Sequence, residues 1–144
     1  MLTVTRRRII PAAIALVAAF GCGGGGDDST GPPGPDVVVG LYTLATVNGQ
    51  ALPVVVDQLG NDKAEVTAGT VTLRADRTFT DITQVRLTIA GNVTNETETA
   101  TGTWTRQTNT VQFNPTGFTA YSMTWDGANR LTQSVAELTL VYTK

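Results

Sequence analysis

Residues 95–106 read Asn-Glu-Thr-Glu-Thr-Ala-Thr-Gly-Thr-Trp-Thr-Arg, and threonine occupies every second position from Thr97 to Thr105. The positions between these threonines include Ala100, Gly102 and Trp104. Successive side chains of a β-strand point to opposite faces of its sheet, whereas one face of an α-helix collects residues three and four apart. The alternation therefore predicts a strand over 95–107, with a wet threonine face and a packed face.

The same period of two recurs along residues 37–144, where 23 of 108 residues are threonine, a β-branched residue that suits a half-buried pleat. No window shows a helical period. Turn-forming pairs separate the alternating runs: Asn48-Gly49, Asp76-Arg77, Gly91-Asn92, Thr108-Asn109 and Asp126-Gly127. We predict strands over 39–47, 51–56, 64–75, 78–90, 95–107, 110–114, 118–125, 130–135 and 137–143, an all-β domain of about eight or nine strands.

Sequential strands joined by tight turns favour a single antiparallel up-and-down β-barrel. Closure would remove the two exposed edges that an open meander leaves, so we expect a barrel, with a two-sheet sandwich as the alternative. Asp81 falls in phase with the apolar residues of its strand and Ile82 out of phase, which predicts a β-bulge there. The predicted core comprises Val71, Leu73, Phe79, Val85, Leu87, Ile89, Trp104, Val111, Phe113, Tyr121, Met123, Trp125, Leu138, Leu140 and Tyr142.

The composition excludes most familiar catalytic and metal sites. The chain has no histidine and one cysteine, so it lacks imidazole ligands, a Ser-His-Asp triad, an intramolecular disulfide and a four-cysteine zinc site. Catalysis by carboxylates alone needs two acids across a sugar-sized cleft, for which a domain of 108 residues has little room. We therefore expect no enzymatic activity, no cofactor and no bound metal.

The first 21 residues have the features of a signal peptide. Three arginines at 6–8 precede an apolar run over 9–20, and about twelve such residues are too few for a bilayer that needs roughly twenty. Removal of the leader would leave seven basic and twelve acidic residues, and this net charge of −5 disfavours nucleic acid as a partner. The expected organisation is a signal helix over 1–21, a disordered Gly/Pro tether over 22–36 and the barrel over 37–144.

The leader ends in Ala19-Phe20-Gly21-Cys22, which resembles the lipobox of bacterial lipoproteins. The resemblance implies that Cys22 receives a diacylglyceryl group, becomes the first mature residue and anchors the protein in a membrane. It also implies the outer membrane if the cell has two membranes, because Gly23 rather than aspartate follows the cysteine. The alternative is an ordinary secretory peptide with Cys22 unmodified. Residues 5–10 resemble a twin-arginine export motif, so the export route stays open.

Other segments resemble the lipocalin-like domains of small bacterial lipoproteins. Gly40-Leu41-Tyr42 has a glycine followed two residues later by the large aromatic residue that plugs one end of such barrels, and Gly102-Thr103-Trp104 repeats this spacing. A hairpin of the same family is matched by Leu73, Asp76, Thr78 and Phe79, with Arg77 in place of its glycine. The resemblance implies a lipocalin-like barrel that binds a small hydrophobic molecule.

Two departures from that family are visible in the sequence. Tyr42 stands where classical lipocalins carry tryptophan, and no residue can be assigned to the arginine that packs over it late in the family's chain. Residues 42–53 also resemble the start of META-type lipoprotein domains, but the later Gly-Cys-Asn segment of that family has no counterpart here. We rank the META-type resemblance second.

Trp104, Tyr121 and Trp125 are the candidate ligand-binding residues, because they fall on predicted inward faces and aromatic walls suit an apolar ligand. The alternative is a filled barrel, since eight strands enclose just enough room for their own side chains. The sequence thus predicts an exported, monomeric cell-envelope protein that is attached to a membrane through Cys22. It either binds a small apolar molecule or acts as a structural or protein-interaction module of the cell surface.

Two groups of acidic residues could form a metal site or line a polar cavity. Asp57, Asp62 and Glu65 could offer oxygen ligands to calcium, but their spacing is not that of a known calcium loop, and a solvated acidic turn is favoured. Glu96 and Glu98 share a strand face with Trp104. We expect that the start of their strand projects beyond the barrel rim; the alternative is that the pair faces a wet cavity.

Overall fold

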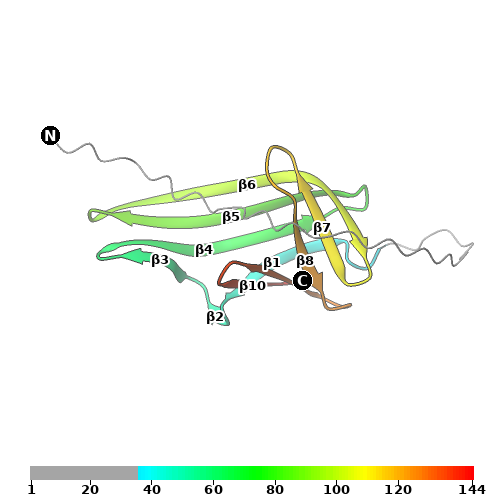
Figure 1. The fold of residues 1–144 in the computed structure, drawn as a ribbon, viewed down its shortest axis with the longest axis horizontal. Coiled ribbons are helices and arrows are strands. Elements are labelled where there is room, and N and C mark those ends of the chain that lie inside the picture. Colours follow the sequence, from blue (N-terminus) through cyan, green and yellow to red (C-terminus); the bar gives the residue numbers. More distant parts are fainter. Residues whose placement is uncertain (1–35) are drawn as a thin grey trace, which may run out of the picture.

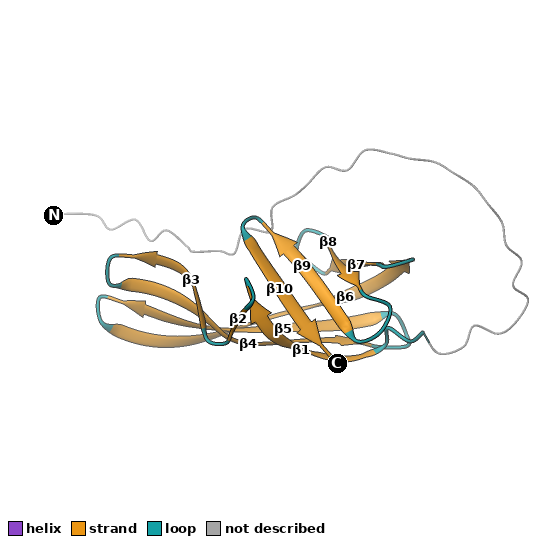
Figure 2. Cartoon of the chain, turned by 90° about the horizontal axis from the view of Figure 1, so that it is seen from below, coloured by secondary structure: helices purple, strands orange, loops and turns teal. Residues whose placement is uncertain are grey.

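The computed structural model describes residues 36–144, which form an all-β structure without a helix (Figures 1 and 2). The predicted leader, Cys22 and nearly all of the tether lie outside these residues. The ten strands are β1 Gly40–Val47, β2 Gln50–Ala51, β3 Val54–Leu59, β4 Asp62–Leu73, β5 Thr78–Ile89, β6 Asn92–Gln107, β7 Thr110–Pro115, β8 Tyr121–Trp125, β9 Arg130–Val135 and β10 Leu138–Thr143.

Eight of these strands form a closed antiparallel barrel. The hydrogen-bonded order runs from β1 through β10, β9, β8, β7, β6 and β5 to β4, and β4 pairs with β1 again. In this closure Thr43 lies opposite Thr143 on one side and opposite Thr70 on the other. The predicted barrel is therefore confirmed, and the sandwich is not found.

The barrel interior follows the predicted alternation. Most inward side chains are completely or almost completely buried, whereas the predicted core residues Tyr121, Leu138 and Leu140 are only partly buried. The threonines on the outer face of β6 stay exposed. The largest fully buried side chains are Trp104, Tyr42, Tyr142, Phe79 and Phe113. Each removes an apolar area from water that is worth about 1.5–3 kcal/mol, so these aromatic residues supply much of the driving force for folding.

Four strands continue beyond the barrel as a sheet that we call the arm: β3 together with residues 62–68 of β4, 83–89 of β5 and 92–99 of β6 (Figure 1). The arm exists because β4, β5 and β6 have 12 to 16 residues, whereas β7 to β10 have five or six. The expectation that Glu96 and Glu98 project beyond the rim is confirmed, since both lie exposed in the arm.

The arm also corrects the predicted core. Val85 and Leu87 are only partly buried, and Ile89 is 51% exposed, although all three continue the inward phase of Phe79. These residues lie beyond the end of the short strands, where no opposite wall of the barrel covers them. The alternation of residues predicts on which face of the sheet a side chain lies. It does not predict whether that face is covered by another part of the protein.

The predicted bulge in β5 is wrong. Residues 78–83 pair with β6 in unbroken register, and Asp81 points inward opposite Val71 and Ala100. The bulge lies instead on β4, between Val66 and Ala68. The predicted strand over 51–56 is split at Leu52–Pro53, because proline has no N–H for the ladder and the chain bends there between β2 and β3.

Gly102 occupies the point where β6 passes from the arm into the barrel and starts to pair with β7. A Cβ at this position would lie 2.2 Å from the carbonyl oxygen of Asn114 and 2.8 Å from Cα of Pro115. The two strands therefore approach each other more closely than any side chain would allow.

Candidate functional site

Trp104 and Trp125, two of the three candidate ligand residues, lie packed near one end of the barrel. Trp104 is 0% exposed, and its indole N–H donates a hydrogen bond of 3.1 Å to the carbonyl oxygen of Arg74. The guanidinium of Arg77 lies 4.4 Å from the ring centroid of Trp104, and that of Arg106 lies 5.1 Å from the ring of Trp125. Both indoles are therefore fixed by cation–π contacts in addition to burial.

Residues 36–39 cover this end, which we call the closed end. The carboxylate of Asp36 lies 3.0 Å from the guanidinium of Arg77 and 3.2 Å from that of Arg106. Burial raises the pKa of Asp36, but the Val38 N–H and the two guanidinium groups outweigh this, and the pKa lies below its usual value. One carboxylate thus connects the N-terminal segment to both cations above the tryptophans.

Tyr42 lies fully buried at the closed end. Its hydroxyl donates a hydrogen bond of 2.8 Å to the carbonyl oxygen of Val38, and burial raises the pKa of Tyr42 to about 12. The cation over its ring is Lys144, whose Nζ lies 5.3 Å from the ring centroid and 2.8 Å from the carbonyl oxygen of Val37. No local sequence pattern connects Lys144 with Tyr42, so this contact could not be predicted from the sequence.

Tyr121, the third candidate, belongs to an aromatic cluster inside the barrel. Its ring stacks on Phe113 at 4.8 Å and meets the ring of Phe79 edge-on at 6.3 Å. Its hydroxyl donates a hydrogen bond of 2.7 Å to Oδ2 of Asp81. Oδ1 of Asp81 is buried and has no partner among residues 36–144, and desolvation raises the pKa of this carboxyl group.

The three candidate residues are thus inside one barrel, and they do not line either of two hollows on the described residues. One hollow lies on the outer face between β6 and β7, beside Thr105 and Gln112. The other is an open depression of about 530 Å³ beside Asn48, Val55 and Leu138. Phe79, Phe113 and Tyr121 form one aromatic cluster, and both tryptophans belong to the buried core against which Tyr121 packs, so side chains fill the interior in this structure.

The arm has two chemically different faces, which follow from its register. On the outer face Glu65 lies opposite Arg86, and the two side chains form a bidentate pair with both N–O distances at 3.0 Å. Lys63 adds a third contact at 3.2 Å. The hydrogen bonds from Arg86 hold the pKa of Glu65 below its usual value. The carboxylate of Glu65 on this face is therefore paired with two cations.

The inner face of the arm continues the barrel interior and is apolar along its centre. Its central residues, which we call the arm strip, are Ala64, Val66, Val85, Leu87 and Ile89. Asp57 lies beside the strip on β3, and Glu96 and Glu98 lie beside it on β6. Neither glutamate forms an ion pair within residues 36–144. This face thus presents an apolar strip between uncompensated carboxylates.

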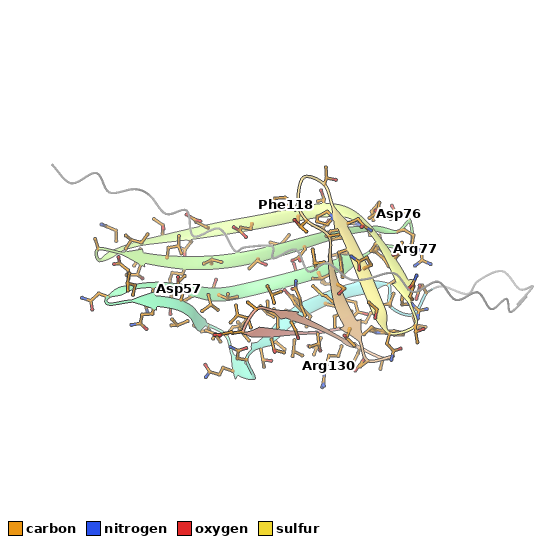
Figure 3. The ribbon with its side chains drawn as sticks, viewed as in Figure 1. Asp57, Asp76, Arg77, Phe118 and Arg130 are labelled. Carbon is orange, nitrogen blue, oxygen red and sulfur yellow. The ribbon has the colours of Figure 1, made fainter. Side chains whose placement is uncertain are left out.

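The register also separates the calcium candidates. Asp57 lies opposite Ala64 on the inner face, whereas Glu65 points to the outer face toward Arg86. The Oδ1 atom of Asp62 accepts a hydrogen bond from the N–H of Ala90 in the β5–β6 turn. Figure 3 shows Asp57 at the arm and Arg77 at the opposite end of the molecule. Residues 36–144 contain no group of three or more acidic, histidine or cysteine side chains placed to hold a metal ion.

Within the same residues, nothing helical is long and apolar enough to span a bilayer. No protein-family model matches this chain, and searches of curated proteins and of solved structures likewise gave no match.

Proposed function

We propose that this chain is an exported, non-enzymatic interaction module, attached to a membrane through Cys22, in which a filled barrel serves as a rigid base for the arm. One observation carries the proposal. The barrel interior is filled by its own aromatic side chains, while a four-stranded sheet extends from it with open edges and with Val85, Leu87 and Ile89 of its inner face only partly covered.

The distribution of contacts supports a division between base and arm. At the closed end, Asp36 joins two guanidinium groups that cover Trp104 and Trp125. At the other end, the arm leaves Leu59 84% and Ile89 51% exposed. Exposed apolar side chains that lie together on a soluble domain mark interaction surfaces. Binding at the arm would cover these residues without opening the barrel.

The membrane anchor is proposed from the leader sequence alone, because Cys22 lies outside the described residues. Its support is the apolar run over 9–20, which Gly21 separates from the only cysteine of the chain. Replacement of Cys22 by serine is expected to release the protein from the membrane fraction, since acyl chains would supply most of the attachment. Unchanged partitioning of Cys22→Ser into detergent would refute the anchor.

Binding of a small apolar molecule is the second candidate function, and one observation favours it. Tyr121 is only partly buried and carries the hydrogen bond to Asp81, whose Oδ1 has no partner, so a ligand with a hydrogen-bond donor could complete this pair. Tryptophan fluorescence of the purified protein, titrated with fatty acids and other apolar probes, separates the two functions. If the barrel interior is filled, the fluorescence should not shift with any probe. A saturable shift that Asp81→Asn weakens would favour binding of a small apolar molecule.

A further inference from the structure

The arm half of β6 has one side that pairs with nothing among residues 36–144. Residues 92–99 pair with β5 on one side, and the pairing with β7 on the other side begins only at Gly102. The N–H of Trp104 donates to Arg77 on the β5 side, and the carbonyl oxygen of Thr101 accepts from Thr116 on the β7 side. In an antiparallel ladder this orientation alternates, so odd residues of β6 direct their backbone groups away from β5.

Four residues therefore present an N–H and a C=O to the open edge: Val93, Asn95, Thr97 and Thr99. The pairing of β6 with β5 contains no register shift, so these groups form a regular row. The other open edge of the arm, β3, is shorter and contains a bulge between Val55 and Asp57. Bulges and short strands protect sheet edges from pairing, and β6 has neither protection.

Glu96 and Glu98 decide which strand can add to this edge. They occupy even positions, where an added antiparallel strand would place its side chains closest, at Cα separations of about 4.5 Å. Two copies of β6 paired about any residue from 95 to 99 would set carboxylates of the two copies directly or diagonally opposite, which is unfavourable. A strand with cations at alternate positions would instead neutralise both glutamates.

We infer that the edge of β6 over 93–99 binds an extended segment of a second protein, one that carries lysine or arginine at alternate positions. The inference rests on the proposed function and specifies its partner. Backbone hydrogen bonds to the four odd residues would supply the affinity, and the cations opposite Glu96 and Glu98 would supply the selectivity. The apolar arm strip lies beside this edge and accommodates apolar side chains of residues that flank the added strand.

The test uses the full chain purified in detergent and a fluorescent peptide in which threonine and lysine alternate. Thr97→Pro removes one N–H that points to the open edge and no hydrogen bond of the fold, since proline is tolerated on edge strands. Thr97→Val keeps that N–H and is the matched control. We expect Thr97→Pro to weaken binding by about ten-fold or more, and Thr97→Val to change it little.

A second variant tests the charges without altering the backbone. Glu96→Lys together with Glu98→Lys should reverse the preference, so that a peptide alternating threonine and glutamate binds better than the lysine peptide. Binding to the original protein should weaken as salt is added. Hydrogen exchange provides a direct readout, because the amides of Asn95, Thr97 and Thr99 should become protected when the lysine peptide is bound.

Three results would overturn the inference. These are no binding of the lysine peptide, binding that Thr97→Pro leaves unchanged, and a concentration-dependent dimer in sedimentation that Thr97→Pro abolishes. The last result would mean that the edge takes a second copy of this chain. Any of these results would refute peptide binding at β6 without bearing on whether the barrel interior is filled. A saturable fluorescence shift with apolar probes would instead contradict the proposed function.

Discussion

Replacement of Gly102 by alanine is expected to destabilise the barrel at the point where the arm joins it. The added Cβ would lie 2.2 Å from the carbonyl oxygen of Asn114 and 2.8 Å from Cα of Pro115, and both atoms belong to the backbone of β7. Ordinary carbon contacts are about 3.5–4.0 Å, so β7 would have to move by about 1 Å or more. No side-chain rotation can relieve this clash.

The size of the effect follows from two opposing contributions. Overpacking of a well-packed site costs about 1–3 kcal/mol, and the upper end applies here because the neighbours are backbone atoms. The restriction of the unfolded chain by alanine recovers about 0.4–1 kcal/mol. The free energy of unfolding should therefore fall by about 2 kcal/mol.

Urea unfolding followed by tryptophan fluorescence measures this change, because Trp104 and Trp125 are buried in the folded barrel. Thr101→Ala is the matched control, since the neighbouring side chain of Thr101 is exposed on the outer face. Its cost should stay below about 1 kcal/mol, which is the whole span of strand propensities. If Gly102→Ala were as stable as the original protein, the close approach of β6 and β7 would not exist in solution.

Two other substitutions test the interior and the closed end. Asp81→Asn should stabilise the protein at neutral pH, because the raised pKa of the buried carboxyl means that folding opposes its ionisation. Relative to Asp81→Asn, the original protein should lose stability as the pH rises from about 3.8, the ordinary pKa, to the higher folded pKa, and the difference should stay constant above it. Urea midpoints whose difference between the two proteins does not change across this pH range would contradict the assignment. Lys144→Ala should cost about 1 kcal/mol, because it removes the cation over Tyr42 and an exposed hydrogen bond, and Lys144→Arg should cost less. Thermal unfolding that ranks the two Lys144 variants equally would show that the cation does not contribute.

The barrel could be predicted from the sequence because its determinant is local. Alternation within β6 separates the outer threonines from Trp104, and the same rule places Phe79, Phe113 and Met123 inside. Closure was also predictable, since an open meander would leave long edges. These features depend only on which residues lie two apart.

Features that depend on distant residues could not be predicted. Asp36 meets Arg106 across 70 positions of the chain, and no local pattern connects them. A carboxylate at an inward position is unfavourable without a partner, so the sequence predicts a bulge near Asp81. The structure resolves this conflict with the hydroxyl of Tyr121, which lies 40 positions away in the chain.

The arm shows that closure of a barrel and protection of its edges are separate problems. A barrel removes every edge only if its strands have equal length, and β6 is 16 residues long whereas its neighbour β7 has six. Shortening β4, β5 and β6 to the barrel would eliminate the open edges without disturbing Trp104 or the closed end. The arm therefore adds nothing that the barrel needs for closure and exposes backbone that most proteins cover. The strand proposed to add to the edge of β6 would cover this backbone.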